Sequence, residues 1–156
     1  MTSSAEGVDD AVRNLRALIL AGENYRQATA QMSGLGVTET QALSYLAIYG
    51  ERGQNELGTD LGISSGASTA LVDRLERQGV AQRYAHPHDR RRVIVRPTEK
   101  GHSLIARSHS WLAASFQSLP PEDLGTVSAG LHQVAQVLRA ESERQLIMAR
   151  RSPREG

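Results

Sequence analysis

Apolar side chains recur at every third or fourth position along much of the chain, which is the spacing of amphipathic helices. The first such stretch predicts a helix over residues 9–32, which ends in a glycine-containing segment. Residues 1–7 are small and polar, and we expect them to fray. Thr38 and Gln41 have the spacing of a capping box, so a second helix is predicted over residues 39–49.

The next segment has the pattern of a helix-turn-helix. A short helix is predicted from Asn55 to Asp60, and Gly62 lies where the chain must turn tightly. Ser64 and Ser65 offer N-caps for a longer helix that runs to Gln78. Gly79 then suits a left-handed helix terminator. Many small helical proteins share this spacing, so the pattern alone does not define a function.

The apolar period then changes from helical to alternating. Residues 80–84 and 92–96 are predicted strands, and the polar residues 85–91 between them form a turn, so the segment is a β-hairpin. Pro97 ends the hairpin. A helix over 98–119 and a final helix that opens at Pro120 complete the chain. The predicted fold class is mainly α with a small β-hairpin, an α+β arrangement.

Charge is unevenly distributed although the whole chain carries a net charge of only +1. Residues 63–100 contain seven Arg and one Lys against four acidic residues, whereas residues 1–62 contain four Arg against eight acidic residues. A local basic segment of this kind favours binding to a polyanion. A solvated basic surface without a partner is the alternative.

Composition excludes several classes of protein. There are no cysteines, which excludes disulfides and thiol-based redox sensing. No stretch has the roughly 18 consecutive apolar residues of a membrane-spanning helix, and no secretory signal opens the chain, so we expect a cytoplasmic protein that does not enter a membrane. His86 and His88 lie beside three arginines, which oppose a metal ion. We find no nucleophile motif, phosphate loop or paired carboxylates, and therefore predict no enzyme, no metal and no cofactor.

A helical wheel of residues 65–78 separates two faces. The wheel places Ala67, Ser68, Leu71, Val72 and Leu75 on the packed face. The opposite face carries Gly66, Thr69, Ala70, Asp73 and Arg77, with Ser65 and Arg74 at its margins. Small residues near the start of this face would let the helix approach base edges in the major groove. An ordinary solvent-exposed face is the alternative.

The hairpin tip strengthens the DNA-binding interpretation. Arg90, Arg91 and Arg92 follow one another beside His86 and His88. Successive strand residues point to opposite faces, so the three arginines cannot all share one surface. We expect the Asp89 carboxylate to orient an arginine for insertion into a narrow minor groove. A solvated charge run is again the alternative.

These residues resemble the MarR (multiple antibiotic resistance regulator) family of winged helix-turn-helix transcription regulators. The family's wing signature, D-x-R followed by five residues and L-T-x-x-G, is met by Asp89, Arg91, Thr98 and Gly101. Pro97 replaces the usual leucine. Residues 55–63 and 71–76 also agree with the family, and the resemblance extends over about residues 9–150.

The resemblance implies a homodimer that binds double-stranded DNA at a pseudo-palindromic operator. It implies an N-terminal dimerisation helix over residues 9–37, a DNA-binding domain over 38–101 and C-terminal dimerisation helices over 102–150. From the wheel, the wing and the resemblance together, the expected DNA-contacting residues are Ser64, Ser65, Gly66, Ser68, Thr69, Ala70, Arg74, Arg77, His88, Asp89, Arg90 and Arg91. The family often has an arginine at the position of Ala70, and its absence removes a candidate for guanine recognition.

Family members are often released from DNA by a small ligand, so the resemblance also implies a lipophilic or phenolic effector. The candidate lining residues are Tyr25, Tyr45, Tyr49, His109 and Trp111, whose aromatic bodies and polar tips suit an amphipathic ligand. Structural roles for these side chains are the alternative. The resemblance favours a repressor that blocks polymerase. A helical protein-interaction adaptor, with a purely structural hairpin, is the competing function.

Overall fold

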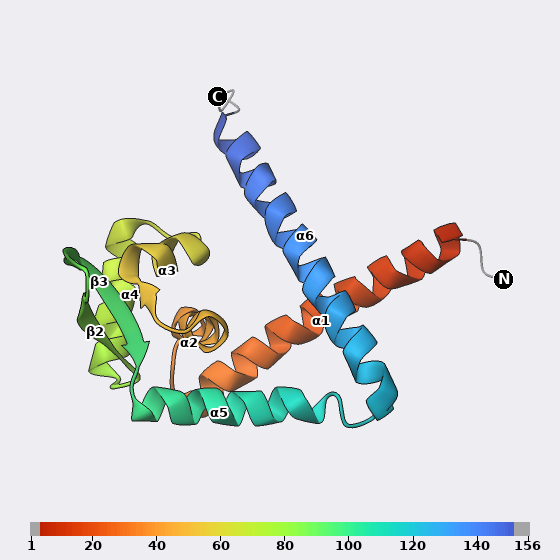
Figure 1. Ribbon diagram of the computed structural model, residues 1–156, viewed down its shortest axis with the longest axis horizontal. Coiled ribbons are helices and arrows are strands. Elements are labelled where there is room, and N and C mark those ends of the chain that lie inside the picture. Colours follow the sequence, from red (N-terminus) through yellow and green to blue (C-terminus); the bar gives the residue numbers. More distant parts are fainter. Residues whose placement is uncertain (1–3, 152–156) are drawn as a thin grey trace. The chain divides into compact units, whose positions relative to one another are not determined.

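Most of the chain is helical, and the few strands form one small antiparallel sheet (Figure 1). The computed structural model describes residues 4–151. The mainly α fold class with a small β-hairpin is confirmed. In chain order the elements are α1 (Ser4–Ser33), α2 (Val37–Tyr49), β1 (Arg52–Gly53), α3 (Gln54–Asp60), α4 (Ser65–Arg77), β2 (Ala81–His86), β3 (Asp89–Pro97), α5 (Glu99–Ala114), the 3-10 helix η1 (Pro121–Asp123) and α6 (Leu124–Arg151).

Packing divides the chain into two compact units, one up to Ser110 and the other from Trp111. The boundary lies inside α5. The first unit contains the helix pair and the sheet, and its core is formed where α2, α3 and α4 meet β3. The fully buried side chains at this core include those of Leu57, Leu71, Val72, Leu75, Val80 and Val95.

Helices α3 and α4 pack closely because Gly58 of α3, which faces Ser68 of α4, has no side chain. A Cβ atom built on Gly58 would lie 2.9 Å from the Ser68 Cβ and 3.0 Å from its Oγ. Ser68 in turn is fully buried. A larger residue at position 58 would push α4 away from α3, so the glycine fixes the position of α4.

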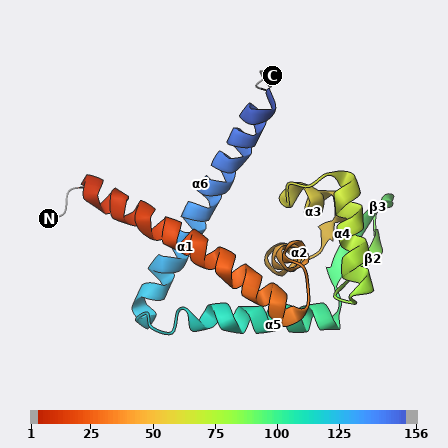
Figure 2. The same cartoon turned by 180° about the vertical axis from the view of Figure 1, so that it is seen from behind.

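The sheet has the strand order β1-β3-β2, with antiparallel pairing throughout. The hairpin is confirmed in place, but its strands are longer than predicted, and the turn between them is only Pro87 and His88. The register shifts between Ala85 and His86. Strand β1 was not predicted, because two residues are too few to show an alternating pattern. They are a strand only because they pair with β3, which lies far along the sequence. Figure 2, the view from behind, shows α4 lying against the hairpin.

Three helix boundaries differ from the sequence prediction. α1 begins at Ser4, so residues 4–7 are helical and not frayed, and the rest of the fraying prediction, residues 1–3, lies outside the described residues. The N-cap of α2 is Gly36, and Thr38 lies inside the helix, so the capping-box prediction is wrong. The Thr40 hydroxyl instead donates a hydrogen bond to the Gly36 carbonyl (3.0 Å). α5 ends at Ala114, five residues before the predicted end.

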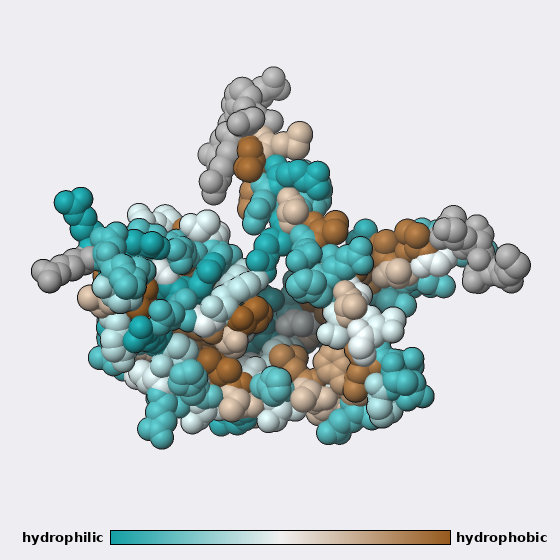
Figure 3. Space-filling view, in the orientation of Figure 1, coloured by the Kyte–Doolittle hydropathy of each residue, from teal (hydrophilic) through white to brown (hydrophobic). Residues whose placement is uncertain are grey.

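The second unit consists of the end of α5, η1 and the 28-residue helix α6. Between residues 124 and 149, only Val127 and Glu141 are partly covered and all other residues are exposed. Figure 3 shows hydrophobic residues on the visible surface of α6 and, in the first unit, of α1. No helix in the described part of the chain is long and apolar enough to cross a membrane.

Candidate nucleic-acid interface

Helix α4 has one buried face and one exposed face, as the helical wheel predicted. Ser68, Leu71, Val72 and Leu75 are buried. The exposed residues include Ser65, Gly66, Thr69, Ala70, Asp73 and Arg77. Ala67, which the wheel placed on the packed face, is also exposed. The exposed face is therefore small at its N-terminal end and charged toward its C-terminal end.

The ends of α4 are formed by the two residues that the sequence indicated. The Ser64 side chain accepts a hydrogen bond from the Ala67 backbone N–H (3.2 Å), which confirms the N-cap. Gly79 has a φ of 68°, a left-handed backbone conformation that residues other than glycine rarely adopt. The N-terminus of α4 is exposed, and its free N–H groups are suited to an anion.

Ser68 is an exception among the predicted DNA-contacting residues. Its relative exposure is 0%. Its hydroxyl donates a hydrogen bond to the Gln54 carbonyl (2.8 Å), which joins α4 to the start of α3. The side chain is therefore part of the interior, and we no longer place Ser68 at the DNA surface.

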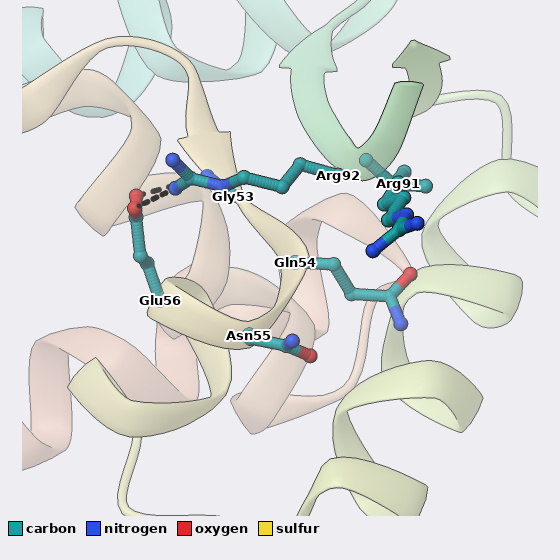
Figure 4. Close-up of a pocket in the computed structure, with 7 residues that line it drawn as sticks. Gly53, Gln54, Asn55, Glu56, Arg91 and Arg92 are labelled. Carbon is teal, nitrogen blue, oxygen red and sulfur yellow. Dashed lines mark hydrogen bonds and ion pairs between the residues drawn. The ribbon is translucent and has the colours of Figure 1, made fainter. Parts of the chain in front are cut away.

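Arg91 and Arg92 leave the hairpin on opposite sides, as the alternation of a strand requires (Figure 4). Arg91 is exposed, and both arginines line one pocket together with Gly53, Gln54, Asn55, Glu56 and Val93. The Arg92 Nη2 contacts the Glu56 Oε1 at 2.5 Å. Arg92 is therefore paired with a carboxylate of α3, although its side chain is 50% exposed.

Glu56 connects the hairpin to the start of α3. Its Oε2 accepts a hydrogen bond from the Gly53 backbone N–H (3.1 Å). This hydrogen bond, together with the positive charges of Arg92 and Arg52, holds the pKa of Glu56 below its ordinary value. The carboxylate is therefore charged at neutral pH, as its ion pair with Arg92 requires.

Asp89 contacts the backbone of the hairpin. Its Oδ1 accepts a hydrogen bond from the Arg91 backbone N–H (3.0 Å). The predicted contact of Asp89 with the guanidinium of the arginine that follows it falls outside the described side chains. His86 Nδ1 accepts a hydrogen bond from the His88 backbone N–H (3.2 Å). Residue 90 belongs to β3, but its side chain lies outside the described part of the structure. The tip is thus held by local hydrogen bonds, with His88 and Asp89 exposed.

The end of the wing signature has a structural explanation. The Thr98 hydroxyl donates to the Gly79 carbonyl (2.7 Å) and accepts from the Gly101 backbone N–H (3.2 Å), which confirms Thr98 as the cap of α5. A Cβ atom on Gly101 would lie 2.0 Å from the Val80 carbonyl oxygen. Only glycine fits there, because the obstacle is backbone. The two residues fix the hairpin against α5.

Arg74 has a contact that sequence reasoning did not identify. Its Nε donates a hydrogen bond to Oε1 of Glu39, a residue of α2 with only 5% exposure. This contact ties α4 to α2 and engages the guanidinium in the fold. Arg77, one turn further along α4, is exposed.

Two residues that sequence reasoning missed border the exposed face of α4. The Gln54 Nε2 donates to the Thr69 Oγ1 (3.0 Å), and the Gln54 Oε1 accepts from the Arg83 Nε (2.9 Å). Arg83 also contacts Asp73 (2.7 Å) and Glu76 (2.5 Å). The two contacts of Gln54 join residues that are 15 and 29 positions apart, so no local pattern indicates them.

The aromatic effector candidates make contacts within the fold. The Tyr25 hydroxyl is hydrogen-bonded to the Ser108 side chain, and the Tyr45 hydroxyl donates to the Asp60 carbonyl (2.9 Å). The Tyr45 and Tyr49 rings stack with centroids 6.0 Å apart, and the Arg52 guanidinium lies 5.1 Å from the Tyr49 centroid. His109 is exposed, and Trp111, in the second unit, is 43% exposed. Residues 4–151 contain no cluster of three or more His, Asp or Glu side chains that could hold a metal ion.

A helix pair, an exposed second helix and a basic hairpin that follows it directly define a winged helix-turn-helix DNA-binding protein. The comparisons with known proteins agree. Residues 33–92 match the model of the MarR family. The chain is 33% identical over 146 residues to the HTH-type transcriptional regulator YcgE of Bacillus subtilis, and this match covers 91% of the chain and 95% of YcgE. The chain belongs to the MarR family.

Other relatives give the same result. The HTH-type transcriptional regulator MhqR of B. subtilis is 31% identical over 99 residues, which cover 60% of the chain and 68% of MhqR. The fold is similar to that of a MarR family protein from Bacillus stearothermophilus, with a TM-score of 0.68, 22% identity and coverage of 88% and 99% of the two chains. It is also similar to MepR of S. aureus in a MepR–DNA complex, with a TM-score of 0.55, 19% identity and coverage of 81% and 98%. The chain is a DNA-binding transcription regulator, in a family of regulators and not of enzymes.

Proposed function

We propose that this regulator is a homodimeric repressor that binds a pseudo-palindromic operator through α4 and the hairpin. The observation that carries the proposal is the exposed face of α4, with Gly66, Thr69 and Ala70. This helix packs against strand β2 of the hairpin, which also carries the exposed Arg91. Small side chains allow α4 to enter the major groove, while an arginine on the wing suits a minor groove. Ser64, Ser65, Arg77, His88, Asp89 and Arg90 complete the proposed DNA surface.

The dimer part of the proposal is supported by the uncovered apolar side chains of the long helices. α1 exposes Val8, Val12, Leu18, Ile19 and Leu20 at 44–62%. α6 exposes Leu131, Val134, Val137, Leu138, Leu146, Ile147 and Met148 at 40–64%. Apolar side chains repeated along two long helices mark an interaction surface, and a second copy would bury both sets. On this basis residues 9–37 and 102–150 are the proposed dimerisation segments, and residues 38–101 the DNA-binding domain.

The wing contact is tested with Arg91→Ala against Arg107→Ala, an exposed arginine of α5 outside the proposed surface. Loss of one phosphate or minor-groove contact lowers the salt dependence of binding by about one unit of slope. We expect Arg91→Ala to weaken operator binding and reduce the slope, and Arg107→Ala to do neither. Equal affinities and slopes for all three proteins would contradict wing binding. Absence of DNA binding by the wild type would instead favour the adaptor.

Repression follows most simply from occupation of a promoter by the dimer. In transcription with purified polymerase, we expect transcript to fall as regulator is added to a promoter that overlaps the bound site. A rise in transcript would identify an activator.

We also propose that a small lipophilic or phenolic ligand releases the operator. The stacked Tyr45 and Tyr49 rings with the Arg52 guanidinium, together with Tyr25, His109 and Trp111, supply aromatic surfaces with polar tips. A thermal-shift screen of phenols and lipophilic weak acids tests this. We expect at least one compound to raise the melting temperature and weaken operator binding. If no compound does either, the effector proposal is wrong, whereas the proposal of operator binding still stands.

A further inference from the structure

We propose that Gln54 is a specificity-determining residue that reads an adenine in each half-site, and that Arg83 is its positioning residue. The proposal rests on operator binding by the exposed face of α4. It concerns residues of α3 and β2, outside the helix that enters the groove. Its starting point is a hydrogen-bonded chain that connects three elements, from Arg83 through Gln54 to Thr69.

The carboxamide of Gln54 has a defined orientation. Its Oε1 accepts from the Arg83 Nε at 2.9 Å, and its Nε2 donates to the Thr69 Oγ1 at 3.0 Å. The reverse orientation would place an NH₂ group against a guanidinium N–H, which pairs two donors. After these two bonds the amide retains one N–H and one oxygen lone pair. One donor and one acceptor on a carboxamide are the pair that recognises adenine N7 and N6.

The position of Gln54 suits base contact because its neighbours on α4 are small. Gly66 and Ala70 leave the space beside Thr69 without long side chains. Figure 4 shows the Gln54 side chain extending from the start of α3 toward α4, on the side of Arg91. The backbone of Gln54 is also fixed, because its carbonyl accepts from the buried Ser68 hydroxyl at 2.8 Å. The residue therefore adds a carboxamide beside an exposed face of α4 that carries none.

Arg83 is fully engaged within the fold. Its Nη1 contacts Asp73 at 2.7 Å and Glu76 at 2.5 Å, and its Nη2 donates to the Thr69 carbonyl at 3.1 Å. Its backbone N–H donates to Glu76 at 2.9 Å. With a carboxylate pair on one side and an amide on the other, Arg83 is not free for phosphate. A planar guanidinium makes these directed contacts together, and a lysine ammonium cannot reproduce them.

The alternative is that this chain of contacts only stabilises the domain. Base preference separates the two roles, because a purely structural contact alters stability or overall affinity and leaves the preference at each base pair unchanged. Bound sites are selected from random DNA with the wild type, Gln54→Ala, Gln54→Glu and Arg83→Lys. Asn55→Ala is the matched control, since Asn55 is the neighbouring exposed amide of α3. Affinity for a non-specific duplex is measured in parallel.

We expect the wild type to prefer an A·T pair at one symmetry-related position of each half-site. Gln54→Ala lowers the ratio of affinities for A·T over other base pairs at this position by on the order of tenfold to a hundredfold, which is the discrimination of one bidentate contact. Gln54→Glu moves the preference to C·G, because a carboxylate accepts from the cytosine N4 amino group. Arg83→Lys weakens the A·T preference and keeps non-specific affinity. Asn55→Ala keeps the wild-type preference.

Retention of every base preference by Gln54→Ala and Gln54→Glu would overturn the assignment of Gln54. If Gln54→Ala does not fold, Gln54→Glu decides, because it preserves the side-chain size and the acceptor for Arg83. An unchanged Arg83→Lys profile would overturn the positioning role. If the wild type selects no sequence, operator binding itself fails, which is a different outcome from loss of the Gln54 assignment.

Discussion

Replacement of Arg74 by alanine tests whether this residue holds α4 in place or contacts DNA. The Arg74 Nε donates to the Glu39 carboxylate, whose side chain is 7% exposed, while the Arg74 side chain is 40% exposed. Glu39 lies in the first turn of α2, where the positive end of the helix also stabilises its charge. Removal of the guanidinium leaves a buried carboxylate without its counter-ion.

The magnitude follows from these exposures. Loss of one partner of a fully buried ion pair costs about 3–5 kcal/mol. Water reaches the arginine side of this pair, and the helix terminus compensates part of the carboxylate charge, so we expect a loss of about 2 kcal/mol for Arg74→Ala. Addition of Glu39→Gln removes the orphaned charge. The double variant should therefore regain part of the loss, with a coupling energy of about 1 kcal/mol.

The assay is equilibrium unfolding in urea, combined with operator titration. Arg77→Ala is the control, because Arg77 is the exposed arginine one turn further along α4. We expect Arg77→Ala to unfold within about 0.5 kcal/mol of the wild type and to bind DNA more weakly. Refutation would be the opposite pattern, in which Arg74→Ala keeps wild-type stability and loses more operator affinity than Arg77→Ala.

Three further outcomes are expected. Gly101→Ala should destabilise the protein by about 1–3 kcal/mol in urea unfolding, because the added Cβ would meet the Val80 carbonyl at 2.0 Å. Gly125→Ala is the control, at a helical position with nothing within 4 Å, and it should be neutral or stabilising. Equal effects of the two substitutions on stability would contradict this explanation. Leu138→Glu should convert the dimer to monomer in analytical ultracentrifugation, whereas Gln136→Glu on the same helix should not; a dimer that survives Leu138→Glu would place the interface elsewhere. The pKa of Glu56 is lowered, so its charged form stabilises the fold at neutral pH, and this contribution is lost as the pH falls through the lowered pKa. Wild type should therefore be slightly more stable than Glu56→Gln at pH 7, and this difference should shrink as the pH falls through the lowered pKa. A difference that grows in acid would contradict the assigned direction.

The parts of the fold that local sequence determines were predicted. The period of residues 65–78, the Ser64 cap and Gly79 define α4, and the change to alternating residues defines the hairpin. Each of these signals lies within a few positions of the feature that it specifies. The resemblance to the MarR family added the expected function, which the relatives then confirmed at the level of a DNA-binding transcription regulator.

The contacts that position the interface could not be predicted in the same way. Arg74 and Glu39 are 35 positions apart, and Arg83 and Gln54 are 29 apart. Ser68 was among the expected DNA-contacting residues although the wheel placed it on the packed face, and its hydroxyl donates a hydrogen bond to the Gln54 carbonyl inside the fold. Only the fold shows which polar side chains are already engaged and which remain free.

We propose that a dimer of this protein recognises two half-sites about one helical turn apart. Selection from random DNA, followed by titration of the selected duplex with and without 5 base pairs inserted at its centre, tests this most directly. We expect an enriched inverted repeat with half-site centres about 10 base pairs apart, and loss of specific affinity when the insertion turns one half-site to the opposite face. No enriched sequence, or equal affinity for both duplexes, would contradict the account.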